Sequence, residues 1–100
     1  MKICIAGKPD SPGKPDVETM DGNLFIVWVE SDTAKSTGVK MYRVEGETKS
    51  EQWKVLGEIY AGFDSKLCFF NYNKHGITSV RVIAVNDEEE SEPSETSIIY

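Results

Sequence analysis

The fold can be inferred outward from Val80-Arg81-Val82-Ile83-Ala84-Val85-Asn86, a run rich in β-branched residues. Val80, Val82 and Ala84 fall on one side of an extended chain and Arg81 on the other, an alternation typical of a half-buried strand. Three further fragments accompany this run: Leu24-Phe25-Ile26-Val27-Trp28, Tyr42-Arg43-Val44-Glu45 and Ser91-Glu92-Pro93-Ser94. Their order and spacing predict two packed antiparallel sheets.

Turn-forming residues separate the strand-like segments, and no stretch has convincing helical periodicity. We expect strands at residues 16–20, 23–29, 39–45, 53–59, 66–70, 78–86 and 94–100. Asp21-Gly22-Asn23 is a tight turn, because glycine takes positive φ without strain. Alternation along the strands predicts these core residues: Leu24, Ile26, Trp28, Tyr42, Val44, Leu67, Phe69, Val80, Val82 and Ala84.

Over residues 12–100 these fragments resemble a fibronectin type III domain. The resemblance implies an all-β, seven-stranded, antiparallel Greek-key sandwich of the immunoglobulin-like kind. Residues 1–11 are then an N-terminal extension and prolyl linker. Thr78 stands where the family usually carries a core tyrosine, so the resemblance implies a divergent member. We expect Tyr72, where the family commonly has leucine, to fill that space.

The charge of the chain limits its partners. Eleven basic and seventeen acidic residues give a net charge of -6, and such a surface repels phosphate backbones. No apolar run approaches the roughly 20 residues of a membrane helix. We therefore expect no nucleic acid partner and no direct membrane insertion.

No residue set suggests catalysis or a cofactor. His75 is the single histidine, there is no GxSxG motif, and Cys68 lies inside a predicted strand without an adjacent base. Cys4, Cys68 and His75 lack the spacing of metal ligands. We expect a non-enzymatic protein without metal or cofactor.

The outward side of two predicted strands is apolar. The family fold sets residues 23–29 and 66–70 side by side, which gathers the outward residues Phe25, Val27, Val29, Cys68 and Phe70. An exposed apolar patch of this kind marks an interaction site in many monomers. Three interpretations stay open: a partner interface, a patch covered by the chain's own apolar Met1–Ala6 stretch, and a wrong assignment of faces.

An acidic cluster precedes the last predicted strand. It contains Asp87, Glu88, Glu89 and Glu90, in a loop where family members often carry recognition residues. A solvated loop, contact with a basic partner and calcium binding are the alternatives, although the run lacks EF-hand spacing.

The resemblance implies a non-enzymatic protein-interaction or spacer module of a larger multidomain protein, with flanking domains of the same chain as neighbours. The alternative is an accessory spacer domain of a secreted enzyme. Receptors and adhesion proteins are the commonest setting. Residues 51–58 are similar to the fibronectin domains of chromatin cofactors, which implies a nuclear co-regulator instead. Two cysteines outside any CxxC pair and the absence of an Asn-x-Ser/Thr sequon favour an intracellular site, and the compartment stays open.

Overall fold

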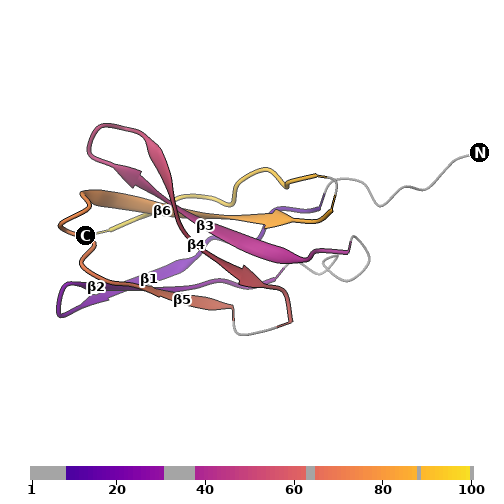
Figure 1. Ribbon diagram of the computed structural model, residues 1–100, viewed down its shortest axis with the longest axis horizontal. Coiled ribbons are helices and arrows are strands. Elements are labelled where there is room, and N and C mark those ends of the chain that lie inside the picture. Colours follow the sequence, from indigo (N-terminus) through magenta and orange to yellow (C-terminus); the bar gives the residue numbers. More distant parts are fainter. Residues whose placement is uncertain (1–8, 31–37, 63–64, 88, 100) are drawn as a thin grey trace, which may run out of the picture.

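Two antiparallel sheets form a sandwich in the computed structural model, which describes residues 9–30, 38–62, 65–87 and 89–99 (Figure 1). The strands are β1 (Asp16–Met20), β2 (Asn23–Val27), β3 (Met41–Thr48), β4 (Trp53–Tyr60), β5 (Lys66–Phe69), β6 (Ile77–Val85) and β7 (Ser97–Ile98). One sheet has the order β1-β2-β5 and the other β4-β3-β6-β7. The predicted seven-stranded β-sandwich is thereby confirmed. In the described part of the chain no helix is long and apolar enough to span a membrane.

Two hairpins fix the register of neighbouring strands. Asp21 (φ 54°) and Gly22 (φ 82°) connect β1 to β2 and bring Met20 opposite Asn23, as expected for a two-residue turn with two positive φ angles. Between β3 and β4 the chain turns at Glu51 (φ 62°), where the Thr48 amide donates to the Gln52 carbonyl at 2.9 Å. Short turns of this kind leave each strand little freedom to slip.

The predicted core is confirmed with two refinements. Eight of the expected residues are buried: Leu24, Ile26, Trp28, Tyr42, Val44, Val80, Val82 and Ala84. Leu67 and Phe69 are partly buried and pack against that cluster, as does Tyr72. Ile77, which the alternation did not select, belongs to the core as well.

A shift in strand register explains the position of Ile77. Thr48 is opposite Ile77 and Glu47 is opposite Ser79, so Thr78 is an extra residue between them. A bulge of this kind interrupts the in–out alternation. The Thr78 hydroxyl donates to the Glu47 carbonyl at 3.2 Å, and Ile77 occupies the core. The position of the usual tyrosine is therefore a bulge in this chain.

The last predicted strand, residues 94–100, is wrong in its extent, because β7 contains only Ser97 and Ile98. Before it, Ser91 and Ser94 each use two groups to bind β6. Their amides donate to the carbonyls of Ala84 and Val82 at 2.8 and 2.9 Å, and their hydroxyls accept from the amides of the same two residues at 2.9 Å. Val82 and Ala84 are two residues apart on β6, whereas Ser91 and Ser94 are three residues apart. Because these spacings differ, the segment and β6 do not form a regular ladder here.

The limits of the other strands differ less from the predicted limits. β2 ends at Val27 instead of Val29, although the Trp28 amide still donates to the Ser65 carbonyl at 3.0 Å. β3 begins at Met41 and continues to Thr48, beyond the predicted range 39–45. Hydrogen bonding, which depends on the neighbouring strand, decides these limits.

Residues 9–15, which precede β1, lie on the sandwich without forming a strand. Pro9, Pro12 and Pro15 are buried, whereas the residues between them are exposed, a three-residue period that matches an extended polyproline chain. The Ser11 hydroxyl donates to the Glu92 carbonyl at 2.9 Å. These contacts hold residues 9–15 against the loop that precedes β7.

Candidate functional site

The outer side of the three-stranded sheet carries the apolar residues that the sequence singled out. Phe25 is opposite Glu18 of β1 and Cys68 of β5. Val27 is opposite Asp16 and Lys66 in the next row along the strands. Since Leu24 and Ile26 are buried, alternation directs Phe25 and Val27 away from the core.

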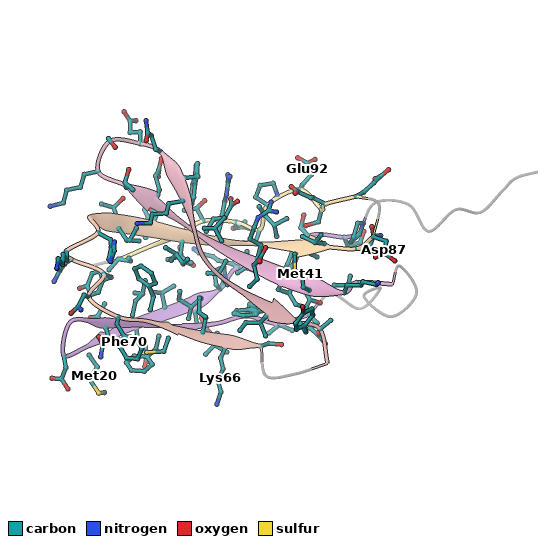
Figure 2. All side chains as sticks on the ribbon, in the orientation of Figure 1. Met20, Met41, Lys66, Phe70, Asp87 and Glu92 are labelled. Carbon is teal, nitrogen blue, oxygen red and sulfur yellow. The ribbon has the colours of Figure 1, made fainter. Side chains whose placement is uncertain are left out.

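The structure places all of the predicted apolar site residues at the surface. The exposed fractions are 38% for Phe25, 47% for Val27, 72% for Val29 and 64% for Phe70. Met20, which was not predicted, is 62% exposed and lies at the same end of this sheet as Phe70 (Figure 2). We call Met20, Phe25, Val27, Val29, Cys68 and Phe70 the outer apolar face.

The outer apolar face was predicted from alternation in two strands, and the same rule could have added Met20. Val17 packs against the core, which puts Glu18 and Met20 on the opposite side of β1. Because Leu24 and Ile26 are buried and Phe25 and Val27 are exposed, the predicted inward and outward sides of β2 are correct. The Met1–Ala6 stretch, considered as a cover, and Cys4 lie outside the described residues.

A groove of about 370 Å³ lies over β2 and β5 within this face. Its outward-facing lining includes Phe25, Val27, Lys66 and Cys68, and Cys68 is a free thiol. The described residues that line the groove include one basic side chain, Lys66, and no acid–base pair. Its shape and composition suit apolar contact better than chemistry.

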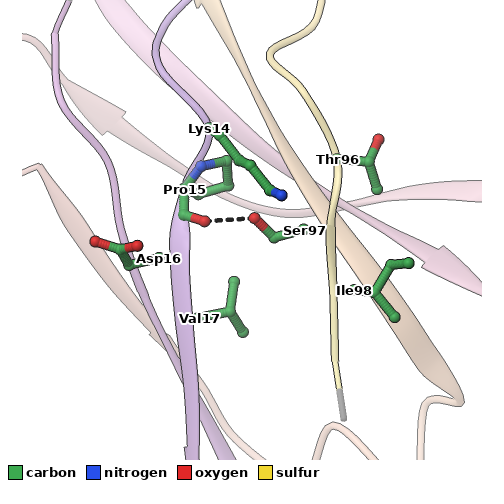
Figure 3. A pocket seen from close by; sticks show the side chains of 7 residues that line it. All are labelled: Lys14, Pro15, Asp16, Val17, Thr96, Ser97 and Ile98. Carbon is green, nitrogen blue, oxygen red and sulfur yellow. Dashed lines mark hydrogen bonds between the residues drawn. The ribbon is translucent and has the colours of Figure 1, made fainter.

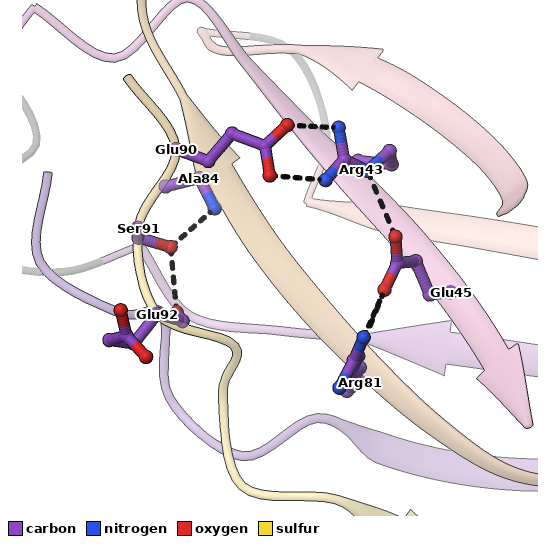
Figure 4. Close-up of polar contacts among 7 residues, drawn as sticks. All are labelled: Arg43, Glu45, Arg81, Ala84, Glu90, Ser91 and Glu92. Atoms are coloured by element: carbon purple, nitrogen blue, oxygen red, sulfur yellow. Dashed lines mark hydrogen bonds and ion pairs between the residues drawn. The ribbon is translucent and has the colours of Figure 1, made fainter. Parts of the chain in front are cut away.

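The acidic loop is held by the domain's own cations. The Asp87 carboxylate lies 2.8 Å from Lys40 Nζ, and both side chains are exposed. Arg43 donates two hydrogen bonds to the Glu90 carboxylate, at 2.8 and 2.9 Å (Figure 4). These bonds lower the pKa of Glu90 and raise the pKa of Arg43. Glu88 lies outside the described residues.

Glu89 differs from these two acids. Its amide donates to Asn86 Oδ1 at 2.7 Å and its carbonyl accepts from the Asn86 amide at 3.0 Å, which closes the turn after β6. Glu89 itself is exposed. The loop thus has a fixed backbone and at least two of its acids paired internally. In the described residues no group of three or more His, Cys, Asp or Glu side chains could hold a metal ion.

An ion network continues from Glu90 across the outer side of the four-stranded sheet. Arg43 also donates to Glu45 at 3.1 Å, and Glu45 accepts from Arg81 Nε at 2.9 Å (Figure 4). Arg81 Nη2 lies 2.8 Å from the same carboxylate oxygen as its ion-pair partner. The Arg81 guanidinium lies 3.9 Å from the ring centroid of Trp53, a cation–π distance. The network was not predicted from the sequence, although Arg43 and Glu45 are two residues apart on β3 and therefore share one face, and Glu45 is opposite Arg81 of β6.

A second groove, of about 470 Å³, follows the seam between β1 and β7 (Figure 3). Across it the Ser97 hydroxyl donates to the Pro15 carbonyl, so the residue before β1 is joined to β7 of the other sheet. Lys14 and Asp16 are its charged residues. Among the described residues, none that lines it is a histidine or cysteine, and they offer no nucleophile with a base.

Comparison with known proteins agrees with this architecture. No family model matches the chain. A solution structure of the fibronectin type-III domain of human fibronectin type III domain containing protein 3 is 23% identical, with a TM-score of 0.69 over 93% of this chain and 85% of that one.

Two larger fragments are similar as well. A crystal structure of domains from titin is 24% identical, with a TM-score of 0.64 over 90% of this chain, and the FN1-FN3 domains of chicken CNTN1 are 24% identical, with a TM-score of 0.66 over 91%. This chain spans about a third of each, 32% and 31%. With its two antiparallel sheets and these likenesses, the chain has the fold of a fibronectin type III domain.

Proposed function

We propose that this chain is a non-enzymatic protein-interaction module of a larger multidomain protein and that it binds through the outer apolar face. Domains of this fold commonly mediate protein interactions or act as spacers. The similar titin and CNTN1 chains each contain several domains.

One observation carries the proposal: whereas the four-stranded sheet combines an ion network with three exposed large apolar residues, Val55, Tyr60 and Ile98, the three-stranded sheet exposes the whole outer apolar face. Five of its large side chains are exposed by 38% or more, among them Phe25, Val29 and Phe70. Contiguous exposed apolar area of this kind costs free energy in water, and burial against a partner recovers roughly 25 cal/mol per Å². The internal pairing of Asp87 and Glu90 makes the acidic loop the weaker candidate.

Binding measurements with point variants test the proposal. Proteins captured by the chain would be identified by mass spectrometry, purified and titrated against wild type, Phe25→Ser and a loop variant that carries Asp87→Asn and Glu89→Gln. We expect Phe25→Ser to weaken binding by tenfold or more, about 1.4 kcal/mol, and the loop variant to bind as wild type does. Equal affinity of Phe25→Ser and wild type would refute the proposed surface.

A further inference from the structure

Opposite charges stand at the two edges of the outer apolar face, so two copies of the face can pair them. In one row across the sheet, Asp16 of β1, Val27 of β2 and Lys66 of β5 are register partners. An acid therefore stands at one end of the row, a base at the other and an apolar residue between them. Figure 2 shows the Lys66 side chain directed away from the sandwich, on the same side as Met20 and Phe70.

Two identical faces can meet in an aligned packing, with their sheets about 10 Å apart. A two-fold axis parallel to the strands, in the plane of contact, puts β1 of one copy opposite β5 of the other and keeps each row at the same height. Asp16 then faces the second copy's Lys66 twice, on both sides of a Val27–Val27 contact.

The other rows bring apolar residues together, and Glu18 then faces the second copy's Cys68 at the rim. The row Glu18–Phe25–Cys68 brings the two Phe25 rings together, where aromatic pairs add to area burial. Extending the β2–β5 register by one residue sets Phe70 in the row of Met20 and Asn23, so Met20 meets the second copy's Phe70, a favourable sulfur–aromatic contact.

The charge order also excludes the other simple arrangement. A two-fold axis perpendicular to the strands through the Phe25 row would put β1 opposite β1 and Glu18 opposite Glu18. Like charges that face each other are unfavourable. Only the axis parallel to the strands pairs opposite charges.

We propose that the outer apolar face binds a second copy of this chain, in a two-fold dimer with Asp16–Lys66 pairs across the interface. The inference rests on the proposed function and names its partner. Because the face is three strands wide, the dimer buries less than the standard area of about 800 Å² per partner. We expect a weak dimer, with a Kd in roughly the micromolar range or above.

Sedimentation equilibrium over a wide range of concentrations tests the dimer. Asp16→Lys and Lys66→Asp each put like charges at both ends of the row, so each variant alone should weaken self-association tenfold or more. Mixed in equal amounts, they should associate again, because each contact between position 16 of one variant and position 66 of the other then joins opposite charges. Phe25→Ser should abolish the dimer. The control is Lys49→Asp, an exposed turn residue with the same change of net charge as Lys66→Asp, and it should dimerise as wild type does.

Two results would overturn the inference: a wild-type chain that stays monomeric at all concentrations, or a mixture of the charge variants that associates no better than each alone. The first result leaves the proposed function standing, because a different protein can occupy the face. That function fails separately, when Phe25→Ser binds an identified partner as tightly as wild type does.

Discussion

The two outer faces of this sandwich use their side chains in opposite ways. On the four-stranded sheet, Arg43, Glu45 and Arg81 bind one another, and Trp53 covers the last guanidinium. On the three-stranded sheet, Phe25 and its neighbours are exposed and the nearest charges stand at the rim. One face pairs its central charges within the domain while Val55 and Tyr60 stay exposed on β4, whereas the other face exposes apolar side chains along β2.

The largest expected loss of stability comes from the centre of the ion network. Glu45→Ala leaves Arg43 and Arg81 facing each other without the shared carboxylate, and the Glu45 side chain is only 12% exposed. We expect a loss of about 2–3 kcal/mol in the free energy of unfolding, measured by urea denaturation. Glu47→Ala on the same strand is the control and should cost about 0.5 kcal/mol or less. Equal losses in the two variants would mean that the network adds nothing.

The serine contacts to β6 come next. Ser94→Ala removes the hydroxyl that accepts from the Val82 amide and leaves a buried N–H without its partner. We expect a loss of about 1–2 kcal/mol, together with faster amide hydrogen exchange at Val82. Ser50→Ala, in the exposed β3–β4 turn, should leave both quantities nearly unchanged. Slow exchange at Val82 in the Ser94 variant would contradict the assignment.

The rim of the network predicts a pH dependence. Arg43 lowers the pKa of Glu90, so the pair stabilises the fold above the ordinary glutamate pKa, and this contribution is lost as the pH falls through the lowered value. Because Glu90 is half exposed, Glu90→Gln should cost less than about 1 kcal/mol near neutral pH. At about pH 2 the variant and wild type should unfold at the same urea concentration. A constant difference at all pH values would rule out the pair as its source.

The smallest effect is expected on the outer apolar face. Val27→Thr keeps a β-branched side chain at a half-exposed position, so the free energy of unfolding should change by about 0.5 kcal/mol or less. The same substitution at the buried Val44 should cost about 1–3 kcal/mol, because the new hydroxyl enters the core. Thermal or urea unfolding of the two variants compares them directly. A large loss at Val27 would mean that the face contributes to the fold itself.

Much of the fold could be predicted because local patterns carry it. The alternation in residues 23–27 and 80–84 identified both faces of those strands, and the Asp21-Gly22 turn followed from its residue types. The limits of β7 could not be predicted, since they depend on how Ser91 and Ser94 meet β6. Ile77 was missed because a bulge at Thr78 shifts the alternation by one residue, and only the pairing with β3 reveals that shift.

In the candidate site, too, local patterns predicted some features and contacts between distant residues decided the others. Phe25, Val27, Val29 and Phe70 were found because a residue's side of a strand is a local property. The acidic residues 87–90 looked like a single charged loop in the sequence, whereas Lys40 and Arg43 bind two of them across the fold.

The sequence by itself determined the number of strands, most of the core and the apolar side of β2 and β5, because backbone alternation acts over two or three residues. Only the tertiary structure decided which charges are paired and which acid and base share a row with Val27. Those relations join residues far apart in the chain, and sheet register alone brings them together.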